Sequence, residues 1–383
     1  SQSIDMHPNS TAIFADLMGR AGRGLFCLVL AGTLASCVAP GPADSRNAEE
    51  QQELVFPPPP ETPRFVFERT IVGSADITVE DSESKWRRVL TGEVDTSTGF
   101  SKPFDVEACQ GHMYVSDTVR RSVHVFNVPT GEYKEIGHDE PGILRKPLGM
   151  DVDGDCNLYV VDGTLKRVVV YDQDGNYLSA FGGTDKFERP AHVAVDADAR
   201  FAYVVDTGGV STDQHRVRVF DLSTGELAYD IGQRGTGEGA FNLPKDIAVG
   251  LDGRVYVVDS SNFRVQVFEA DGTYVHTFGS IGVQPGQFSR PKGVATDPNG
   301  NVYVTDAAFG NFQIFNPAGE LLLFIGTRST SAGAAKYMLP AGIAVDEDGR
   351  VYMVDQFFRK VDVYRPATIG PQEGYMGARA ASY

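Results

Sequence analysis

The chain has 383 residues, and its 34 basic and 51 acidic side chains give a formal net charge of −17. A surface with this average charge repels a phosphate backbone, so nucleic acid is not expected as a partner. No run in the sequence reaches the roughly 18 apolar residues that suggest a membrane-spanning helix.

Residues 1–36 are predicted to be a signal peptide. Two arginines precede the apolar stretch Gly24–Ala35, which has the length of a signal-peptide core and is too short to span a bilayer. Residues 1–17 carry acidic side chains that fit poorly ahead of such a core, which points to Met18 as the start of translation.

A cysteine follows the apolar stretch. The sequence Leu34-Ala35-Ser36-Cys37 resembles the lipobox of bacterial lipoproteins, in which the signal is cut before the cysteine and its sulfur carries lipid. The next residue is Val38 rather than Asp, which the enterobacterial sorting rule associates with the outer membrane. We therefore expect lipidation at Cys37 and an outer membrane lipoprotein, facing the periplasm or the cell surface. A chance cysteine after an ordinary signal is the alternative.

Residues 37–63 are predicted to be a linker between the lipid and a globular domain. The run Pro57–Pro60 favours extended polyproline II, which acts as a semi-rigid spacer.

Six similar units fill residues 64–366. Each has short apolar runs separated by turn residues, as in Gly286–Gly326, where Asn299-Gly300 supplies a tight hairpin turn. The second run of each unit ends in an aspartate, and these aspartates are 45, 44, 53, 47 and 49 residues apart, the range for a four-stranded propeller blade. The six aspartates are Asp117, Asp162, Asp206, Asp259, Asp306 and Asp355.

These units predict an all-β fold, a six-bladed β-propeller. In the last unit Gly370 follows Tyr364 by only 6 positions, too few for a turn and a fourth strand. The alternating stretch Arg64–Gly73 can supply that strand, so we expect the ring to close with an N-terminal strand and the C-terminal tail, 367–383, to lie outside it. The repeats resemble NHL repeats, and the whole resembles six-bladed NHL lipoproteins of bacteria rich in multihaem cytochromes. That resemblance implies a fold but no specific activity.

The aspartate at the end of every second strand recurs six times, which favours a structural role. We expect it to cap the following turn and to pair with a basic residue that opens the third strand. The alternative is that these basic residues form an exposed ring that binds a partner. The residues predicted for this position are Arg121, Arg167, Arg216, Arg264 and Lys360, with Asn311 in the fifth unit.

The innermost strands differ from one another where they open. Glycine is the default there because backbones crowd the axis, but Asp105, His192 and Asp246 take its place in three units. Two carboxylates and an imidazole could hold a divalent cation, Ca²⁺ or Zn²⁺, in the axial channel. The alternative is a hydrated channel without an ion. Zinc lyase chemistry like that of the peptidylamidoglycolate lyases is disfavoured, because only His192 matches their histidine positions.

Cys109 and Cys156 lie in the turns between the first and second strands of adjacent units, hence on one rim of the ring. An extracytoplasmic location permits a disulfide between them if their Cα atoms lie within about 7 Å.

Trp86, Arg87 and Arg88 form an aromatic and basic patch in the connection that precedes the first unit. Such a composition is typical of interface anchors. We expect the patch to bind an envelope protein, with packing onto the ring as the alternative.

The sequence supports two hypotheses for function. The first is a lipid-anchored envelope scaffold that binds proteins, with extracytoplasmic multihaem cytochromes as candidate partners. The second is a metal-dependent hydrolase or lyase with its site at the propeller axis.

Overall fold

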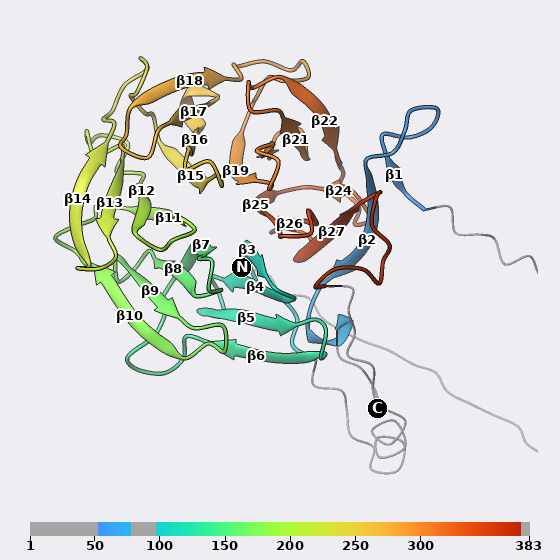
Figure 1. Ribbon diagram of the computed structural model, residues 1–383, viewed down its shortest axis with the longest axis horizontal. Coiled ribbons are helices and arrows are strands. Elements are labelled where there is room, and N and C mark those ends of the chain that lie inside the picture. Colours follow the sequence, from blue (N-terminus) through green and yellow to red (C-terminus); the bar gives the residue numbers. More distant parts are fainter. Residues whose placement is uncertain (1–52, 78–96, 377–383) are drawn as a thin grey trace, which may run out of the picture. The chain divides into compact units, whose positions relative to one another are not determined.

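The computed structural model describes residues 53–77 and 97–376, which form strands, turns and two short 3₁₀ helices, Ser74–Asp76 and Ser260–Asn262 (Figure 1). In these two ranges no helix is long and apolar enough to cross a membrane.

Six antiparallel sheets make up the fold, as predicted, and we call them blades one to six. Blades one to three contain β3 (Pro103–Cys109), β4 (His112–Asp117), β5 (Ser122–Asn127) and β6 (Glu132–Ile136); β7 (Pro147–Val152), β8 (Leu158–Asp162), β9 (Arg167–Tyr171) and β10 (Tyr177–Gly182); and β11 (Pro190–Val195), β12 (Phe201–Asp206), β13 (Arg216–Asp221) and β14 (Glu226–Ile231). Blades four to six contain β15 (Pro244–Val249), β16 (Val255–Asp259), β17 (Arg264–Phe268) and β18 (Tyr274–Phe278); β19 (Pro291–Thr296), β20 (Val302–Asp306), β21 (Asn311–Phe315) and β22 (Leu321–Ile325); and β25 (Pro340–Val345), β26 (Val351–Asp355), β27 (Lys360–Pro366), β2 (Phe65–Ile71) and β1 (Val55–Phe56). A short parallel pair, β23 (Thr327–Arg328) and β24 (Lys336–Tyr337), lies between blades five and six.

The blades form a closed ring. The first strand of each blade contacts the first strands of both neighbours, in the order β3, β7, β11, β15, β19, β25 and back to β3 (Figure 1). One face of the ring, here the loop face, carries the starts of these strands, the loops between second and third strands and the connections between blades. The opposite face, here the hairpin face, carries the turns between first and second strands and between third and fourth strands.

The ring is closed by the N-terminal strand, as predicted. β2 pairs antiparallel with β27 from Phe65 opposite Pro366 to Ile71 opposite Val361. Arg350 of the blade is fully buried and donates to the Glu68 carboxylate of β2 at 2.9 Å. The two ends of the chain's folded part are thus joined by both a strand ladder and a buried ion pair.

The last part of the predicted linker, residues 37–63, belongs to the folded domain. Val55 and Phe56 form β1, which pairs with Val66 and Phe65 of β2 and makes blade six five-stranded. The Phe56 ring packs edge-on against Tyr364, with ring centroids 5.8 Å apart. These two apolar residues cover the free edge of β2, so the proline run is part of a turn rather than an extended spacer.

The glycine that ends each of the first five blades has a packing role. Gly279, for example, has a left-handed φ of 80°, and a Cβ there would lie 2.3 Å from the Phe288 ring that leads into the next blade. Phe288 is fully buried in a cluster that joins blades four and five, with Tyr256, Phe278 and Phe315. The apolar-glycine signature therefore makes room for an aromatic or aliphatic side chain that locks neighbouring blades together.

Candidate functional site

The aspartates that end the second strands are structural. The carboxylate of Asp306 accepts the backbone N–H groups of Ser289 and Arg290, just before β19, at 2.8 and 2.9 Å. It also accepts those of Ala308 and Phe309 in the following loop, at 2.8 and 3.2 Å. The aspartate therefore caps its loop, as predicted, and also fastens it to the start of the innermost strand.

The predicted pairing with basic residues occurs in two blades. Arg264 meets Asp259 at 2.8 Å and Arg216 meets Asp206 at 3.5 Å. Arg167 instead donates to the backbone carbonyls of Pro141 and Ile143.

Two of the predicted ring members are placed differently. Lys360 is buried and binds Asp362 at 2.5 Å rather than the aspartate of its own second strand. Arg121 misses the third strand by one residue, because Ser122 is the residue that pairs with Asp117. Arg121 lies exposed in the loop, with a left-handed φ of 60°. The cations at this position are therefore not uniformly exposed: Lys360 is buried and Arg121 is exposed, while the others are half-buried. Partner binding by the accessible members stays a prediction.

Asp105, His192 and Asp246 do meet at the axis, as their positions on β3, β11 and β15 predict. His192 Nε2 lies 2.8 Å from Asp105 Oδ2 and 3.1 Å from Asp246 Oδ1. The carboxylates also accept backbone amides: Asp105 from Met150, and Asp246 from Ile247 and Val294. All three side chains are buried, and His192 Nδ1 has no hydrogen-bond partner.

Glu107 and Asp151 add two more carboxylates to the channel. Burial raises the pKa of Asp151 to about 7, and that of Asp246 also to about 7, while burial and the Asp151 and Asp105 charges raise the pKa of Glu107 well above its usual range. Burial alone would lower the pKa of His192, but the Asp246 and Asp105 carboxylates outweigh it and raise the value to about 9. The raised pKa values of Glu107, Asp151 and Asp246 therefore favour bound protons near neutral pH, next to a positively charged His192 imidazole.

The arrangement does not favour the predicted divalent cation. In the described part of the chain, one group of three potential ligands has its donor atoms all within 4.8 Å of one another, and it is Cys109, Cys156 and Glu347. The axial three do not form such a group; instead His192 Nε2 lies between the two carboxylates, at hydrogen-bond distance from each.

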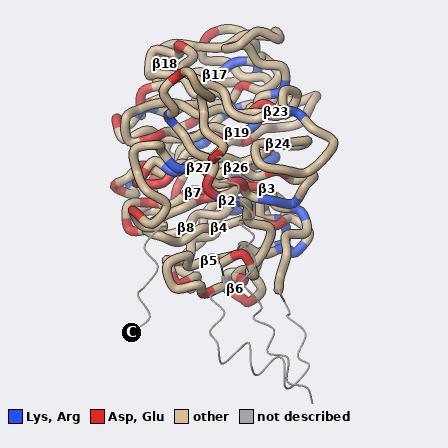
Figure 2. Tube along the Cα trace, turned by 90° about the vertical axis from the view of Figure 1, so that its right-hand side faces the viewer, with Lys and Arg blue, Asp and Glu red and all other residues tan. Residues whose placement is uncertain are grey.

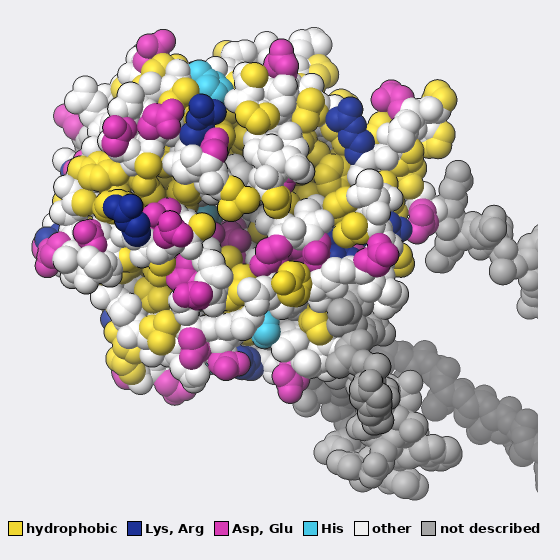
Figure 3. Space-filling view, in the orientation of Figure 1, with side chains coloured by type: hydrophobic (Ala, Val, Ile, Leu, Met, Phe, Trp, Pro, Cys, Tyr) yellow, Lys and Arg dark blue, Asp and Glu magenta, His cyan; other side chains and the backbone are white. Residues whose placement is uncertain are grey.

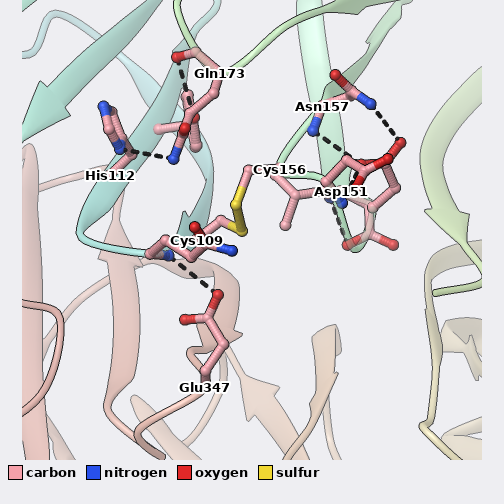
Figure 4. Close-up of a disulfide and its surroundings, with 12 residues drawn as sticks. Cys109, His112, Asp151, Cys156, Asn157, Gln173 and Glu347 are labelled. Atoms are coloured by element: carbon pink, nitrogen blue, oxygen red, sulfur yellow. Dashed lines mark hydrogen bonds between the residues drawn. A yellow bond between two sulfur atoms is a disulfide. The ribbon is translucent and has the colours of Figure 1, made fainter.

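Cys109 and Cys156 form a disulfide, with Cα atoms 5.7 Å apart, and so offer no thiolate to a metal (Figure 4). The bond ties the hairpin turns of blades one and two. Glu347 from blade six reaches the same place and accepts the Gln110 N–H at 3.0 Å, which adds a contact across the closure of the ring (Figure 4).

The channel has two unlike ends. Toward the hairpin face lies a cavity of about 390 Å³ whose charged lining is mainly acidic: Glu107, Asp151, Asp153, Asp297, Asp346 and Glu347. Acidic side chains (magenta) are prominent around the middle of the ring face in Figure 3. Toward the loop face lies a cavity of about 310 Å³ lined by five cations, Lys102, Lys146, Arg189, Lys245 and Lys292. Lys and Arg (blue) appear beside β3 and near β23 in Figure 2.

This cationic cavity was missed by the sequence reasoning, although the sequence contains a signal for it. Each of its five cations is next to the proline that opens a first strand, as in Lys102-Pro103 and Pro244-Lys245. Because every blade starts in the same way, residues flanking these prolines come together around the axis.

Two sequence segments match the NHL repeat family model, residues 241–268 and 288–315. They coincide with strands of blades four and five, within a ring of six repeated sheets. The chain is an NHL-repeat β-propeller.

The propeller is similar to proteins of several kinds. It is 36% identical to mouse NHL repeat-containing protein 3 over 88 residues, which are 22% of this chain and 24% of that protein. In structure it is similar to hydrazine synthase of Kuenenia stuttgartiensis, with a TM-score of 0.50 and 15% identity over 73% of this chain and 100% of that one. It is also similar to a gluconolactonase of Xanthomonas campestris, with a TM-score of 0.51 and 15% identity over 78% of this chain and 98% of that one. At such identities the two structures show the fold alone.

Four of the predicted functional residues, Cys37, Trp86, Arg87 and Arg88, lie outside the described residues.

Proposed function

We propose that this NHL-repeat β-propeller is a lipid-anchored scaffold of the bacterial envelope that binds a protein partner on its loop face. The anchor is Cys37. Extracytoplasmic multihaem cytochromes are the partner class that the sequence resemblance suggests.

The main support is the distribution of exposed apolar side chains. Five large apolar residues on the loop face are between 57% and 77% exposed: Val119, Val210, Ile281, Val283 and Phe357. Among the described residues in the turns of the hairpin face, only Leu251 is a large apolar residue exposed to this extent. The five loop-face residues lie on loops of several blades, and loops carried by a rigid scaffold are where binding residues are commonly found.

The alternative, a metal-dependent hydrolase or lyase, has less support. Its candidate residues Asp105, His192 and Asp246 bind one another and backbone amides, and they lie below the channel mouth rather than on an open surface. Those contacts join the innermost strands of different blades. This structural role accounts for the three residues without a catalytic one.

A photo-crosslinking amino acid at Phe357 or Ile281 tests the docking face, with Leu251 on the hairpin face as the matched control. In intact envelopes we expect a discrete crosslinked band from the two loop-face positions and none from Leu251. The substitution Phe357→Asp should weaken the crosslink from Ile281 while leaving the melting temperature unchanged, because Phe357 is exposed. Equal crosslinking from Leu251, or no band from either loop-face position, would show that the loop face is not the docking surface.

A further inference from the structure

The cavity on the loop face brings five positively charged side chains together. Lys102, Lys146 and Arg189 immediately precede the prolines that open β3, β7 and β11, while Lys245 and Lys292 immediately follow those that open β15 and β19. The cation thus precedes the proline in blades one to three and follows it in blades four and five, always at the same end of the channel. All five line one cavity of about 310 Å³.

None of these five side chains has an ion pair or a side-chain hydrogen bond with any described residue. Other basic side chains of the same propeller are paired, including Arg216, Arg264, Arg350 and Lys360. In a chain with 51 acidic residues, five unpaired cations around one opening are unexpected. Two carboxylates, Asp105 and Asp246, also line the cavity, but both are held by His192. The five cations outnumber them and repel one another, and a bound anion would relieve that repulsion.

The pKa values of two of the lysines are lowered, as expected where positive charges lie close together. Burial, together with the charges of Arg189 and Lys292, lowers the pKa of Lys245 to about 8. Burial and the nearby Arg290 lower the pKa of Lys292 as well. Both side chains remain only partly exposed, so solvent screens their charges less than it would on an open surface.

A second, independent observation comes from the floor of the cavity. His192 is 6% exposed and lines both this cavity and the one toward the hairpin face, and its Nδ1 has no hydrogen-bond partner among the described residues. Its Nε2 is held by Asp105 and Asp246, which fixes the ring and leaves Nδ1 as the free donor. A buried donor without an acceptor is rare in folded proteins and indicates a missing partner.

We propose that the loop-face mouth of the channel binds a small anion with two or more negative charges, a polycarboxylate or a phosphate. Several lysines in a ring are point charges that can be shared by the separate oxygens of one such ligand. The carboxylates of the opposite cavity that lie nearer its opening, including Asp153, Asp297 and Glu347, would repel the same ligand, so it would bind and leave on the loop face. A nucleic acid strand is not the ligand, because the acidic surface outside the cavity repels a long phosphate backbone.

Isothermal titration calorimetry at pH 7 and constant ionic strength tests this with citrate and with inorganic phosphate as probes, and with acetate as the monovalent comparison. The variant pair is Lys245→Gln/Lys292→Gln, and the matched control is Lys166→Gln/Lys336→Gln, which removes the same charge outside the cavity. We expect at least one of the two multivalent anions to bind and acetate to bind at least about tenfold more weakly. Whichever of citrate and phosphate binds more tightly identifies the ligand chemistry.

The cavity variant should lose at least about tenfold in affinity for that anion, because charge-assisted hydrogen bonds are lost. The control variant should bind as the native protein does. Without ligand, the cavity variant should melt at the same or a higher temperature, because repulsion has been removed; this separates loss of binding from loss of folding. Three results would overturn the proposal: no binding of citrate or phosphate, unchanged binding by the cavity variant, or equal losses in both variants, which would indicate only a diffuse surface field.

Discussion

At the scale of single residues, the six repeated aspartates illustrate why repetition indicates structure rather than chemistry. Each lies at the end of the second strand, next to both the loop that follows it and the segment that leads into the first strand. A carboxylate has enough acceptor positions to bind both segments. In the fifth blade Asp306 accepts four backbone N–H groups. No uncharged side chain of that length offers as many acceptor positions.

The substitution Asp306→Ala should therefore lower the free energy of unfolding by about 3 to 5 kcal/mol, because four partly buried N–H groups lose a charged acceptor. Urea unfolding followed by circular dichroism measures this. Asp271→Ala is the control, since Asp271 is exposed and accepts a single backbone N–H, from Thr273, at 2.9 Å; it should cost less than about 1 kcal/mol. Similar costs for the two variants would contradict the structural role.

A second residue-scale prediction concerns pH. The pKa of Asp151 is raised by burial to about 7, so the folded protein binds a proton there between about pH 4 and 7 that the unfolded chain does not. Stability from this group is fully present at low pH and is lost as the pH rises through 7. Asp151→Asn mimics the neutral acid, and it should gain roughly 2 to 4 kcal/mol relative to the native protein between pH 5 and pH 8.

Urea unfolding of both proteins at pH 5 and pH 8 measures that difference. Asp155→Asn, in the exposed turn of the same blade, should show no such dependence on pH. If the difference between Asp151→Asn and the native protein is the same at both pH values, the carboxyl group does not titrate in this range.

At the scale of elements, the closing strand shows how the two ends of a repeat array are joined. The buried ion pair between Glu68 of β2 and Arg350 has side-chain exposures of 5% and 0%, so neither charge can be hydrated if its partner is lost. A second pair joins Glu53 to Arg365 at 3.0 Å, but there the glutamate is 64% exposed. The two pairs connect the same N-terminal segment to the same blade and differ in burial.

Glu68→Ala should therefore destabilise the propeller by about 3 to 5 kcal/mol, because it leaves the buried Arg350 with only the more distant Asp348 carboxylate, at 3.5 Å. Glu53→Ala should cost less than about 1 kcal/mol, since an exposed pair contributes little. Thermal and urea unfolding of the two variants measures both. A small loss for Glu68→Ala would mean that the β2–β27 ladder alone closes the ring.

Most of the architecture was predictable because it follows from local, repeated signals. The spacing of the six aspartates gave the blade number, and the short distance from Tyr364 to Gly370 indicated that a strand from elsewhere completes blade six. The start of the folded part was less predictable. Proline runs are usually spacers, and the role of Val55 and Phe56 depends on the uncovered edge of β2, which is a property of the assembled sheet.

The candidate site was predicted only in part. Asp105, His192 and Asp246 were found because they depart from glycine at one repeated position. The five cations of the loop-face cavity precede the proline in three blades and follow it in two, so no single aligned position contains them all. Whether a basic residue is paired or free also depends on neighbours from other blades, as the different partners of Arg167 and Arg264 demonstrate. Pairing of this kind follows from the folded arrangement and not from a local pattern.

At the scale of the whole molecule, attachment to a membrane would hold the propeller close to its partner. A cysteine that carries several acyl chains anchors a protein stably, whereas a single chain gives only marginal binding. Cys37→Ala should abolish labelling by a palmitate analogue and move the protein from the membrane fraction to a soluble or uncleaved form. Cys27→Ala is the matched control, because this cysteine lies ten residues earlier within the apolar stretch and should leave labelling unchanged. Labelling that persists in the Cys37 variant, or that is lost in the Cys27 variant, would show that Cys37 is not the lipid site.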